Sequence, residues 1–334
     1  MTLDHELQAR LSLVGPDVVD VSVVVPVYDE EGNIAELHRQ LGAALSALNR
    51  SSEIIFVDDG SKDGTLRELA RVRDLDPRVE VISLRRNFGK TPALLAGFAE
   101  ARGQYIITLD GDLQDDPAEL PRFVEALDSG LDLVSGWKKV RHDPASKTVP
   151  SRLFNFTVRR STGIPLHDFN CGFKGYRREV LDEVKLYGEL HRFIPVMAFR
   201  RGFQIGELEV QHHPRRFGRS KFGPGRFLKG MLDFVTVLFL TRYMQQPLQL
   251  FGLLGLALWL LGFLGFLYIL VLKILGQSVF AAHGPLLFLS GILIVSGIQL
   301  IMLGLLGEML RNYAFRSTEE YSVKERLTHG RPDL

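Results

Sequence analysis

"LDGDLQDD", at residues 109–116, places four aspartates in eight positions directly after the short apolar run 105–108. An apolar run of this kind is typical of a strand buried in a sheet, and its end would deliver Asp110 and Asp112 together at one edge of that sheet. Two carboxylates so close together repel one another unless water surrounds them or a cation lies between them. The stretch therefore indicates both a buried strand and a site where two carboxylates need water or a cation.

Strand-like and helix-like segments alternate on both sides of this stretch. The expected strands are Val21–Val25, Glu53–Val57, Val79–Leu84, Tyr105–Leu109 and Leu131–Ser135, and the expected helices are Glu31–Leu48, Thr65–Val72, Thr91–Ala101 and Pro117–Leu127. This alternation predicts an α/β domain with an open, Rossmann-like, mostly parallel sheet, in which ligands bind at the carboxyl ends of the strands. Residues 136–222 show a looser pattern, and we expect a smaller, loop-rich half that completes the site.

Two long runs without charged residues, 248–272 and 284–307, follow the α/β region. About 20 apolar residues span the hydrocarbon core of a bilayer, so both runs predict transmembrane helices; a pair of buried core helices is the alternative. The connector 273–283 carries one lysine, whereas Lys and Arg are frequent on the other side of both runs. By the positive-inside rule, both termini are expected in the cytoplasm of a multi-pass protein of the inner membrane.

The apolar segment 227–239 precedes the first run and is flanked by Arg226 and Arg242. It predicts an amphipathic helix on the membrane surface, with burial against the catalytic domain as the alternative. The start of the chain has no apolar core of signal-peptide length. The expected organisation is a cytoplasmic catalytic domain at 1–222, a juxtamembrane helix at 223–246, two transmembrane helices within 247–310 and a cytoplasmic tail at 311–334.

Composition excludes some classes of protein. The 40 Lys and Arg nearly balance the 39 Asp and Glu, so no global positive field points to nucleic acid. Cys171 is the single cysteine, which excludes an internal disulfide and suits a reducing compartment.

The pair Asp110 and Asp112, with Gln114 two residues on, is typical of a site for a hard divalent cation such as Mg²⁺ or Mn²⁺. Mg²⁺ commonly shares its coordination shell with substrate phosphates. Solvated loop aspartates are the plain alternative. Helix capping is another, and it fits Asp115 or Asp116 before Pro117 better.

A basic segment near 213–230 contains six Lys or Arg and no acidic residue. One interpretation is a solvated basic face that meets anionic lipid headgroups. The other is a lid loop near 213–223, whose glycines give mobility and whose cations bind phosphate oxygens. Both hold if the acceptor is itself an anionic lipid.

Several motifs, in this order, resemble those of a known family: "PVYDEEGN", "VDDGSKDGT", "RRNFGKTPALLAGF" and "LDGDLQDDP", followed by "SRLFN", "DFNCGFKGYRREV" and "RRFGRSKFG". The chain resembles family 2 glycosyltransferases with the GT-A fold. Within them it is similar to dolichyl-phosphate mannose synthases and to bacterial polyprenyl-phosphate glycosyltransferases with two C-terminal membrane helices. The resemblance covers nearly the whole chain, and its motifs are specific together rather than singly.

The resemblance also implies roles for residues. It assigns the nucleoside of the donor to Pro26, Tyr28, Glu30, Val57 and Asp59, and the metal on the donor diphosphate to Asp110, Asp112 and Gln114. Arg152 would bind the acceptor phosphate, and Arg215 and Lys221 would close over both phosphates. Lys138 lies in "GWK", where the mannose synthases have an arginine in a G-S-R segment, so Arg141 is a candidate to share its role.

The implied reaction is transfer of a hexose or related sugar from a nucleotide-sugar, with UDP preferred by family analogy, to polyprenyl phosphate. A phosphate dianion needs no proton removed, so no dedicated general base is expected, and one in-line displacement inverts the anomeric carbon. Family analogy also suggests a homotetramer. Two alternatives stay open, a processive polysaccharide synthase of the same family and an inactive membrane scaffold that keeps the fold.

Overall fold

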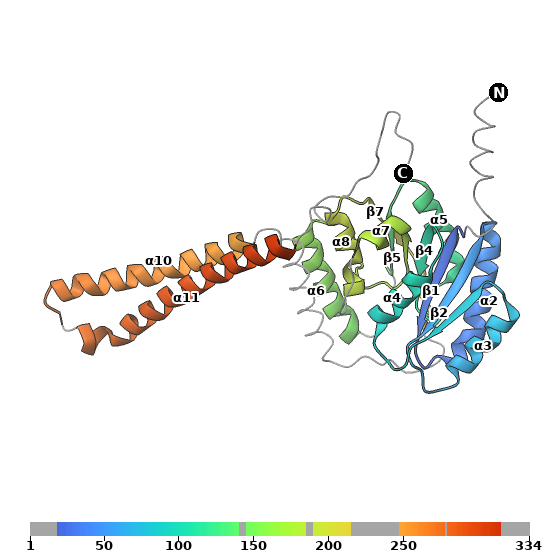
Figure 1. Cartoon of the computed structure of the whole chain (residues 1–334), viewed down its shortest axis with the longest axis horizontal. Helices are drawn as coiled ribbons and strands as arrows, with labels where there is room; N and C mark the ends of the chain where they lie inside the picture. The colour runs from blue at the N-terminus through green and yellow to red at the C-terminus, as the bar shows by residue number, and fades with distance from the viewer. Residues whose placement is uncertain (1–18, 140–144, 185–189, 215–246, 278, 315–334) are drawn as a thin grey trace, which may run out of the picture. The chain divides into compact units, whose positions relative to one another are not determined.

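The computed structural model describes residues 19–139, 145–184, 190–214, 247–277 and 279–314. The chain divides into two units, one ending at residue 234 and the other beginning at residue 235. The first unit contains the sheet and the second contains two long helices (Figure 1). The junction between the units and the helix expected over 227–239 lie outside the described residues.

The first unit is built on a seven-stranded sheet with the order β3-β2-β1-β4-β6-β5-β7. The strands are β1 (Val21–Val27), β2 (Ser52–Asp58), β3 (Val79–Ser83), β4 (Tyr105–Thr108), β5 (Leu133–Trp137), β6 (Lys174–Arg177) and β7 (Ile205–Glu209). Strand β6 runs antiparallel to both β4 and β5, and the other pairings are parallel. The prediction of a mostly parallel sheet is confirmed.

Helices cover both faces of this sheet (Figure 1), which explains why the central strands are apolar on both sides. Helices α2 (Glu31–Leu48), α3 (Thr65–Leu75) and α5 (Leu120–Asp128) pack in one core cluster with β1. Helix α4 (Lys90–Glu100) packs on the opposite side of β1 and β2, through Ala93 and Leu94. The short helices α7 (Arg178–Glu183) and α8 (Ile194–Arg200) pack on β5 and β6.

Residues 136–214 contain more regular structure than the sequence pattern predicted. Helix α6 (Ala145–Thr162) precedes β6, and a 3₁₀ turn (Leu190–Phe193) leads into α8 and β7. Strands β6 and β7 join the same sheet as the first five strands. The expected loop-rich half is therefore an extension of the central sheet.

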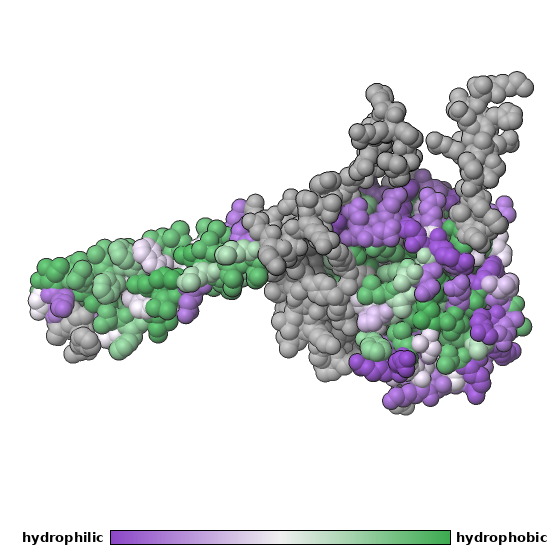
Figure 2. Space-filling model, viewed as in Figure 1, coloured by the Kyte–Doolittle hydropathy of each residue, from purple (hydrophilic) through white to green (hydrophobic). Residues whose placement is uncertain are grey.

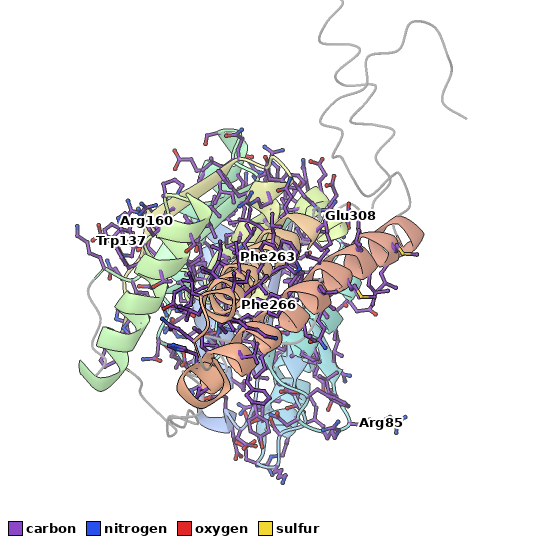
Figure 3. The ribbon with its side chains drawn as sticks, turned by 90° about the vertical axis from the view of Figure 1, so that its left-hand side faces the viewer. Arg85, Trp137, Arg160, Phe263, Phe266 and Glu308 are labelled. Carbon is purple, nitrogen blue, oxygen red and sulfur yellow. The ribbon has the colours of Figure 1, made fainter. Side chains whose placement is uncertain are left out.

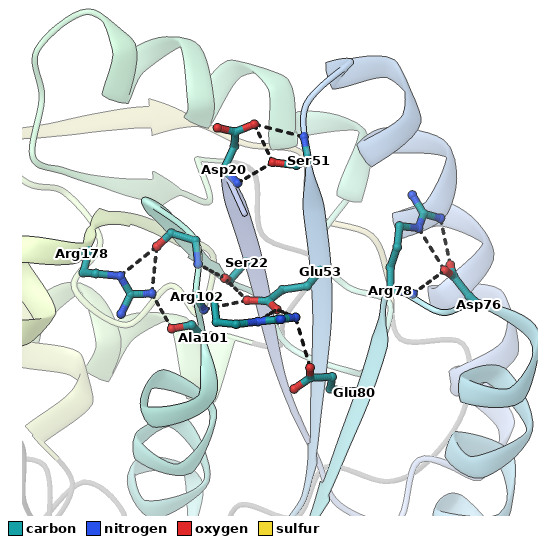
Figure 4. Close-up of polar contacts among 11 residues, drawn as sticks. Asp20, Ser22, Ser51, Glu53, Asp76, Arg78, Glu80, Ala101, Arg102 and Arg178 are labelled. Atoms are coloured by element: carbon teal, nitrogen blue, oxygen red, sulfur yellow. Dashed lines mark hydrogen bonds and ion pairs between the residues drawn. The ribbon is translucent and has the colours of Figure 1, made fainter. Parts of the chain in front are cut away.

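At the N-terminal ends of the strands, polar side chains form a closed network (Figure 4). The buried carboxylate of Glu53 accepts hydrogen bonds from the Ser22 hydroxyl at 2.6 Å and from the Arg102 main-chain and guanidinium nitrogens at 2.6–2.9 Å. The Ser22 hydroxyl in turn accepts from Gly103 N at 2.7 Å. The charge of Glu53 at this end of the sheet is thus paired with groups of the same chain.

The second unit contains α10 (Pro247–Ile274) and α11 (Val279–Ala314), the latter kinked at His283 beside Pro285. Glycines bring the two helices into close contact. A Cβ added at Gly255 would lie 2.6 Å from the Gly297 carbonyl oxygen, and one at Gly262 would lie 2.7 Å from that of Ser290. Small residues at such points allow the backbones of paired membrane helices to approach one another.

The outer surfaces of α10 and α11 are apolar (Figure 2). Large side chains such as Phe263 and Phe266, both labelled on α10 in Figure 3, are 42% and 46% exposed. Residues 247–274 and 283–310 are each long and apolar enough to cross a membrane, and few of their side chains are buried. So much exposed apolar surface is costly in water, and it indicates that this unit associates with a membrane.

Candidate active site

The carboxyl ends of four strands bring the candidate residues to one edge of the sheet. Tyr28 follows β1, Asp59 follows β2, Asp110 follows β4 and Lys138 follows β5. Because β1, β2, β4 and β5 all point in the same direction, these side chains gather at one edge although they are far apart in sequence.

A pocket of about 500 Å³ lies at the ends of β1, β2 and β3. Tyr28 and Asp58 contribute to its wall, together with residues 83–87 after β3. Lys62 and Arg86 add positive charge, and Arg85 extends outward at the rim (Figure 3). An aromatic ring, a carboxylate and several cations around a pocket of this size suit a nucleoside with an attached phosphate.

Asp59 fixes the loop that borders this pocket. Its buried carboxylate accepts hydrogen bonds from Phe88 N at 2.7 Å and from Gly89 N at 2.9 Å. Burial raises the pKa of Asp59, and these two main-chain amides oppose that effect. Gly60, at φ +70°, packs so closely on the main chain of Arg86 that an added Cβ would lie 2.4 Å from its carbonyl carbon. The end of β2 therefore holds the loop 84–89 in place.

The two predicted metal carboxylates lie on a tight turn after β4. Asp112 is almost buried, and its Oδ1 accepts a hydrogen bond from Gln114 N at 3.2 Å. Leu113, between Asp112 and Gln114, has φ +58°. This backbone conformation costs energy in a residue with a side chain, and it is concentrated at functional sites. Gly172 backs Asp110 so closely that an added Cβ would lie 2.6–2.7 Å from its carboxylate. The chain thus leaves space for Asp110 by having glycine there.

Lys90, the first residue of α4, forms an ion pair with Asp110 through its ammonium and Oδ1. Burial would raise the pKa of Asp110, but the ammonium groups of Lys90 and Lys138 outweigh it and hold that pKa well below the ordinary carboxyl range. Asp110 is therefore ionised over the physiological pH range, as a metal ligand must be.

Lys138 forms an ion pair with a buried acid. Its ammonium lies 2.6 Å from Oδ1 of Asp115, a fully buried carboxylate. Burial alone would lower the pKa of Lys138, but Asp115 raises it well above its usual value. Of the two residues proposed as helix caps, Asp116 accepts a hydrogen bond from Ala118 N at 3.0 Å, whereas Asp115 is a counter-ion.

Three more buried titratable groups surround the end of β4. Lys174 donates to the main-chain carbonyls of Phe169 and Cys171, and burial lowers its pKa to about 8. Burial raises the pKa of the Cys171 thiol to about 12, so this thiol is not a nucleophile near neutral pH. Burial also lowers the pKa of His191, whose Nδ1 lies 2.7 Å from the Thr91 hydroxyl.

The residues present fit a divalent cation that is shared with a substrate. Asp110 and Asp112 supply hard oxygen ligands, and Gln114 is adjacent, as Mg²⁺ and Mn²⁺ require. Among the residues that the structure describes, there is no group of three or more His, Cys, Asp or Glu that could hold a metal by itself. A cation here would therefore need oxygens from water or from a diphosphate to complete its shell.

The other predicted residues are placed less directly. Pro26 lies within β1, and the side chain of Val57 is buried against α4, so Val57 can offer a donor only its main chain. The carboxylate of Glu30 accepts from Asn33 Nδ2 at 2.5 Å at the start of α2. Arg152 lies on α6. The Arg152 side chain lies outside the described residues, as do Arg141, Arg215 and Lys221 in full.

Sequence reasoning missed Lys90, Asp115, Lys174 and His191 as members of the site. Lys90 had a signal, because it directly precedes a predicted helix at the carboxyl edge of the sheet. Lys174 had none, because its burial follows from the antiparallel pairing of β6.

Solved structures share this fold. Glucosyl-3-phosphoglycerate synthase from Mycobacterium tuberculosis, in complex with Mn²⁺, uridine diphosphate and phosphoglyceric acid, superposes with a TM-score of 0.52 over 71% of this chain and 81% of that chain, at 20% identity. Another structure of that synthase, with phosphoglyceric acid, gives a TM-score of 0.51 over 67% of this chain and 80% of that chain, at 19% identity. These solved structures show the fold of the first unit, which is the GT-A fold.

Sequence comparison gives the family. The model of glycosyl transferase family 2 matches residues 22–185. A dodecaprenyl-phosphate galacturonate synthase from Rhizobium johnstonii is 38% identical over 92% of this chain and 93% of its own length. An undecaprenyl-phosphate 4-deoxy-4-formamido-L-arabinose transferase from Pseudomonas aeruginosa is 41% identical over 93% and 91%. The chain belongs to glycosyltransferase family 2, and these relatives align with both its catalytic unit and its apolar helices.

Proposed function

We propose that this enzyme transfers a sugar from a nucleotide-sugar, with UDP as the preferred nucleotide, to a polyprenyl phosphate at the cytoplasmic face of the membrane. The observation that carries the proposal is the placement of Asp110 and the nearly buried Asp112 at the same sheet edge as a pocket of about 500 Å³. Two relatives that align over nine-tenths of the chain are named as polyprenyl-phosphate sugar transferases, which supports the choice of acceptor.

In this proposal the nucleoside occupies the pocket beside Tyr28, and its diphosphate extends toward Asp110 and Asp112. A bound Mg²⁺ or Mn²⁺ would neutralise charge that develops on the departing nucleoside diphosphate. Lys90 and Lys138 add positive charge around the same point. The carboxylates hold the diphosphate through the metal, and the lysines stabilise the leaving group.

The acceptor needs orientation rather than activation. A phosphate monoester is mostly a dianion near neutral pH, so its oxygen can attack the anomeric carbon without a base that removes a proton. Arg152 on α6 is proposed to hold that phosphate, and Arg215, Lys221 and Arg141 are proposed to close over the reactants. A single in-line displacement then inverts the anomeric centre.

The two apolar helices are consistent with an acceptor that is a membrane lipid. A polyprenyl chain leaves a bilayer only at a cost of about 0.8 kcal/mol for each CH₂ exposed to water, so the enzyme must work at the headgroup plane. We propose that 247–274 and 283–310 cross the membrane and tether the catalytic unit there, with both termini in the cytoplasm.

The test uses purified full-length protein with Mn²⁺, undecaprenyl phosphate and radiolabelled UDP-sugars, including UDP-galacturonate and UDP-4-deoxy-4-formamido-L-arabinose. We expect label from one donor to enter the lipid phase with wild type and with Asp116→Asn, which keeps a helix cap on the same loop. Asp112→Asn should lower this transfer by about 100-fold or more. Equal transfer by Asp112→Asn would refute the proposed metal role, and no transfer from any donor by folded wild type would favour the inactive scaffold.

A further inference from the structure

Lys90 and Asp110 form an ion pair that solvent and ligands can reach. The side chain of Lys90 is 30% exposed and that of Asp110 is 34% exposed. The nearby cations have other attachments: Lys138 lies 2.6 Å from Asp115, and Lys174 donates to main-chain carbonyls. Lys90 therefore places its ammonium directly against one of the two proposed metal ligands.

The main chain directly before Lys90 is held by Asp59, which follows β2 beside the proposed nucleotide pocket. Asp59 holds the amides of Phe88 and Gly89, and Gly89 has φ +100°, which turns the chain into α4. Residues 84–87 of the same loop line the pocket. One loop thus borders the pocket at one end and delivers an ammonium to Asp110 at the other.

An ammonium and a divalent cation cannot both lie against Oδ1 of Asp110, because like charges at that distance repel strongly. A metal ion that binds without a diphosphate must displace the Lys90 ammonium from Asp110, and the positive charge of that ammonium then stays close to the metal. A diphosphate that arrives with the metal brings the negative charge that the displaced ammonium needs. The arrangement therefore opposes binding of the metal alone and favours binding of metal and diphosphate together.

We propose that Lys90 is a place-holding counter-ion: it occupies Asp110 in the metal-free enzyme, leaves when a divalent cation and a nucleoside diphosphate bind together, and then pairs with the diphosphate. The proposal rests on the proposed function for the identity of its ligands. Its consequence is that the metal and the nucleotide bind with positive coupling, and that Lys90 is a source of this coupling.

The test measures Mn²⁺ binding by electron paramagnetic resonance of free Mn²⁺, on the full-length protein in detergent, without nucleotide and with UDP. Lys90→Met should bind Mn²⁺ alone about fivefold more tightly than wild type, as expected when an opposing ion pair of about 1 kcal/mol is removed. The tightening of Mn²⁺ binding by UDP should shrink by at least the same factor. Lys90→Arg keeps the charge and should preserve the coupling.

The matched control is Lys139→Met, because Lys139 is a neighbouring exposed lysine that pairs with Glu209 at 3.0 Å. It should leave both Mn²⁺ affinities unchanged. A residue with only a structural role would weaken Mn²⁺ binding when replaced, so weaker or unchanged binding by Lys90→Met without nucleotide overturns the proposal. Absence of Mn²⁺ binding by both wild type and Lys90→Met also overturns it.

The sugar-transfer assay tests the proposed function separately from the Mn²⁺ binding measurement. Lack of sugar transfer from every donor would refute that function, whereas the Mn²⁺ comparison without nucleotide would still decide whether Lys90 competes for Asp110. Loss of Mn²⁺ binding in Asp112→Asn, with tighter binding in Lys90→Met, would support the proposal whichever sugar is transferred.

Discussion

The two ends of the central sheet use acidic residues in opposite ways. At the N-terminal ends of the strands, the buried carboxylate of Glu53 is held by a hydroxyl, a main-chain amide and a guanidinium together. At the C-terminal ends, Asp110 contacts the ammonium of Lys90, a flexible side chain that is about one-third exposed. The structural acid Glu53 is thus buried and held by several donors, whereas Asp110, proposed to bind a metal, is partly exposed and has a partner that a ligand can replace.

The largest expected effect is at the C-terminal end, on activity. Asp112→Asn removes a hard anionic ligand from the proposed metal site, and sugar transfer should fall by about 100-fold or more. Its midpoint of thermal unfolding should stay near that of wild type, because asparagine keeps a side-chain oxygen that can accept the hydrogen bond from Gln114 N. Radiolabel transfer and unfolding in detergent check the two parts. A large loss of stability would mean that Asp112 belongs with Glu53 as a structural acid.

Lys138 is the intermediate case, because it lies at the active edge but has a buried partner. Lys138→Met leaves the Asp115 carboxylate without this counter-ion, and the free energy of unfolding should fall by about 3 kcal/mol. Lys139→Met breaks only an exposed pair with Glu209 and should cost about 1 kcal/mol or less. Thermal unfolding of both full-length variants makes the comparison. Equal stability of the two would show that Lys138 serves the donor rather than the fold.

At the N-terminal end the matched pair is Glu53 and Glu80, which both contact Arg102. Glu53→Gln disturbs a buried charge with several donors and should lower stability by about 2 kcal/mol. Glu80→Gln removes an exposed contact at 3.2 Å and should cost about 0.5 kcal/mol. Transfer activity measured well below the unfolding temperature should be unchanged in both. A specific loss of activity in Glu53→Gln would contradict the division between the two ends.

The sequence predicted those parts of the molecule that local patterns determine. Helix α2 was predicted with the observed bounds, because its apolar residues recur with helical spacing. In the structure, Asn49 ends this helix in the left-handed conformation at φ +51°. The first five strands were found through their apolar runs. Strand β6, "KGYR", has no such run, and it is a strand because β4 and β5 pair with it on both sides.

The candidate site was predicted in the same uneven way. Asp110 and Asp112 are recognisable because both lie within one motif at a strand end. The pairs Lys90–Asp110 and Lys138–Asp115 join residues on different elements, and no local pattern specifies which lysine meets which acid. Such pairings depend on the order of strands in the sheet, which one sequence does not specify.

The smallest expected effect is a pH dependence at the N-terminal end. Asp76 accepts hydrogen bonds from Arg78, at 2.8–3.0 Å, and lies 3.0 Å from His38 Nε2. The side-chain hydrogen bonds from Arg78 are the largest cause that lowers the pKa of Asp76, well below its usual value. Folding therefore favours the ionised carboxylate. The resulting stability is fully present above the unfolded pKa, near 4, and is lost as the pH falls below it.

Asp76→Asn should accordingly lower the free energy of unfolding by about 1 kcal/mol at pH 7 and by less at pH 3, where the carboxyl of the unfolded chain is largely protonated. Asp74→Asn is the control, because Asp74 is exposed and pairs only with the adjacent Arg73 among the described contacts. Denaturant titrations at both pH values measure the difference. A loss of stability that is equal at pH 7 and pH 3 would show that the shape of the Asp76 side chain matters rather than its charge. The hydrogen bonds from Arg78 would then stabilise the fold equally well with a neutral acceptor.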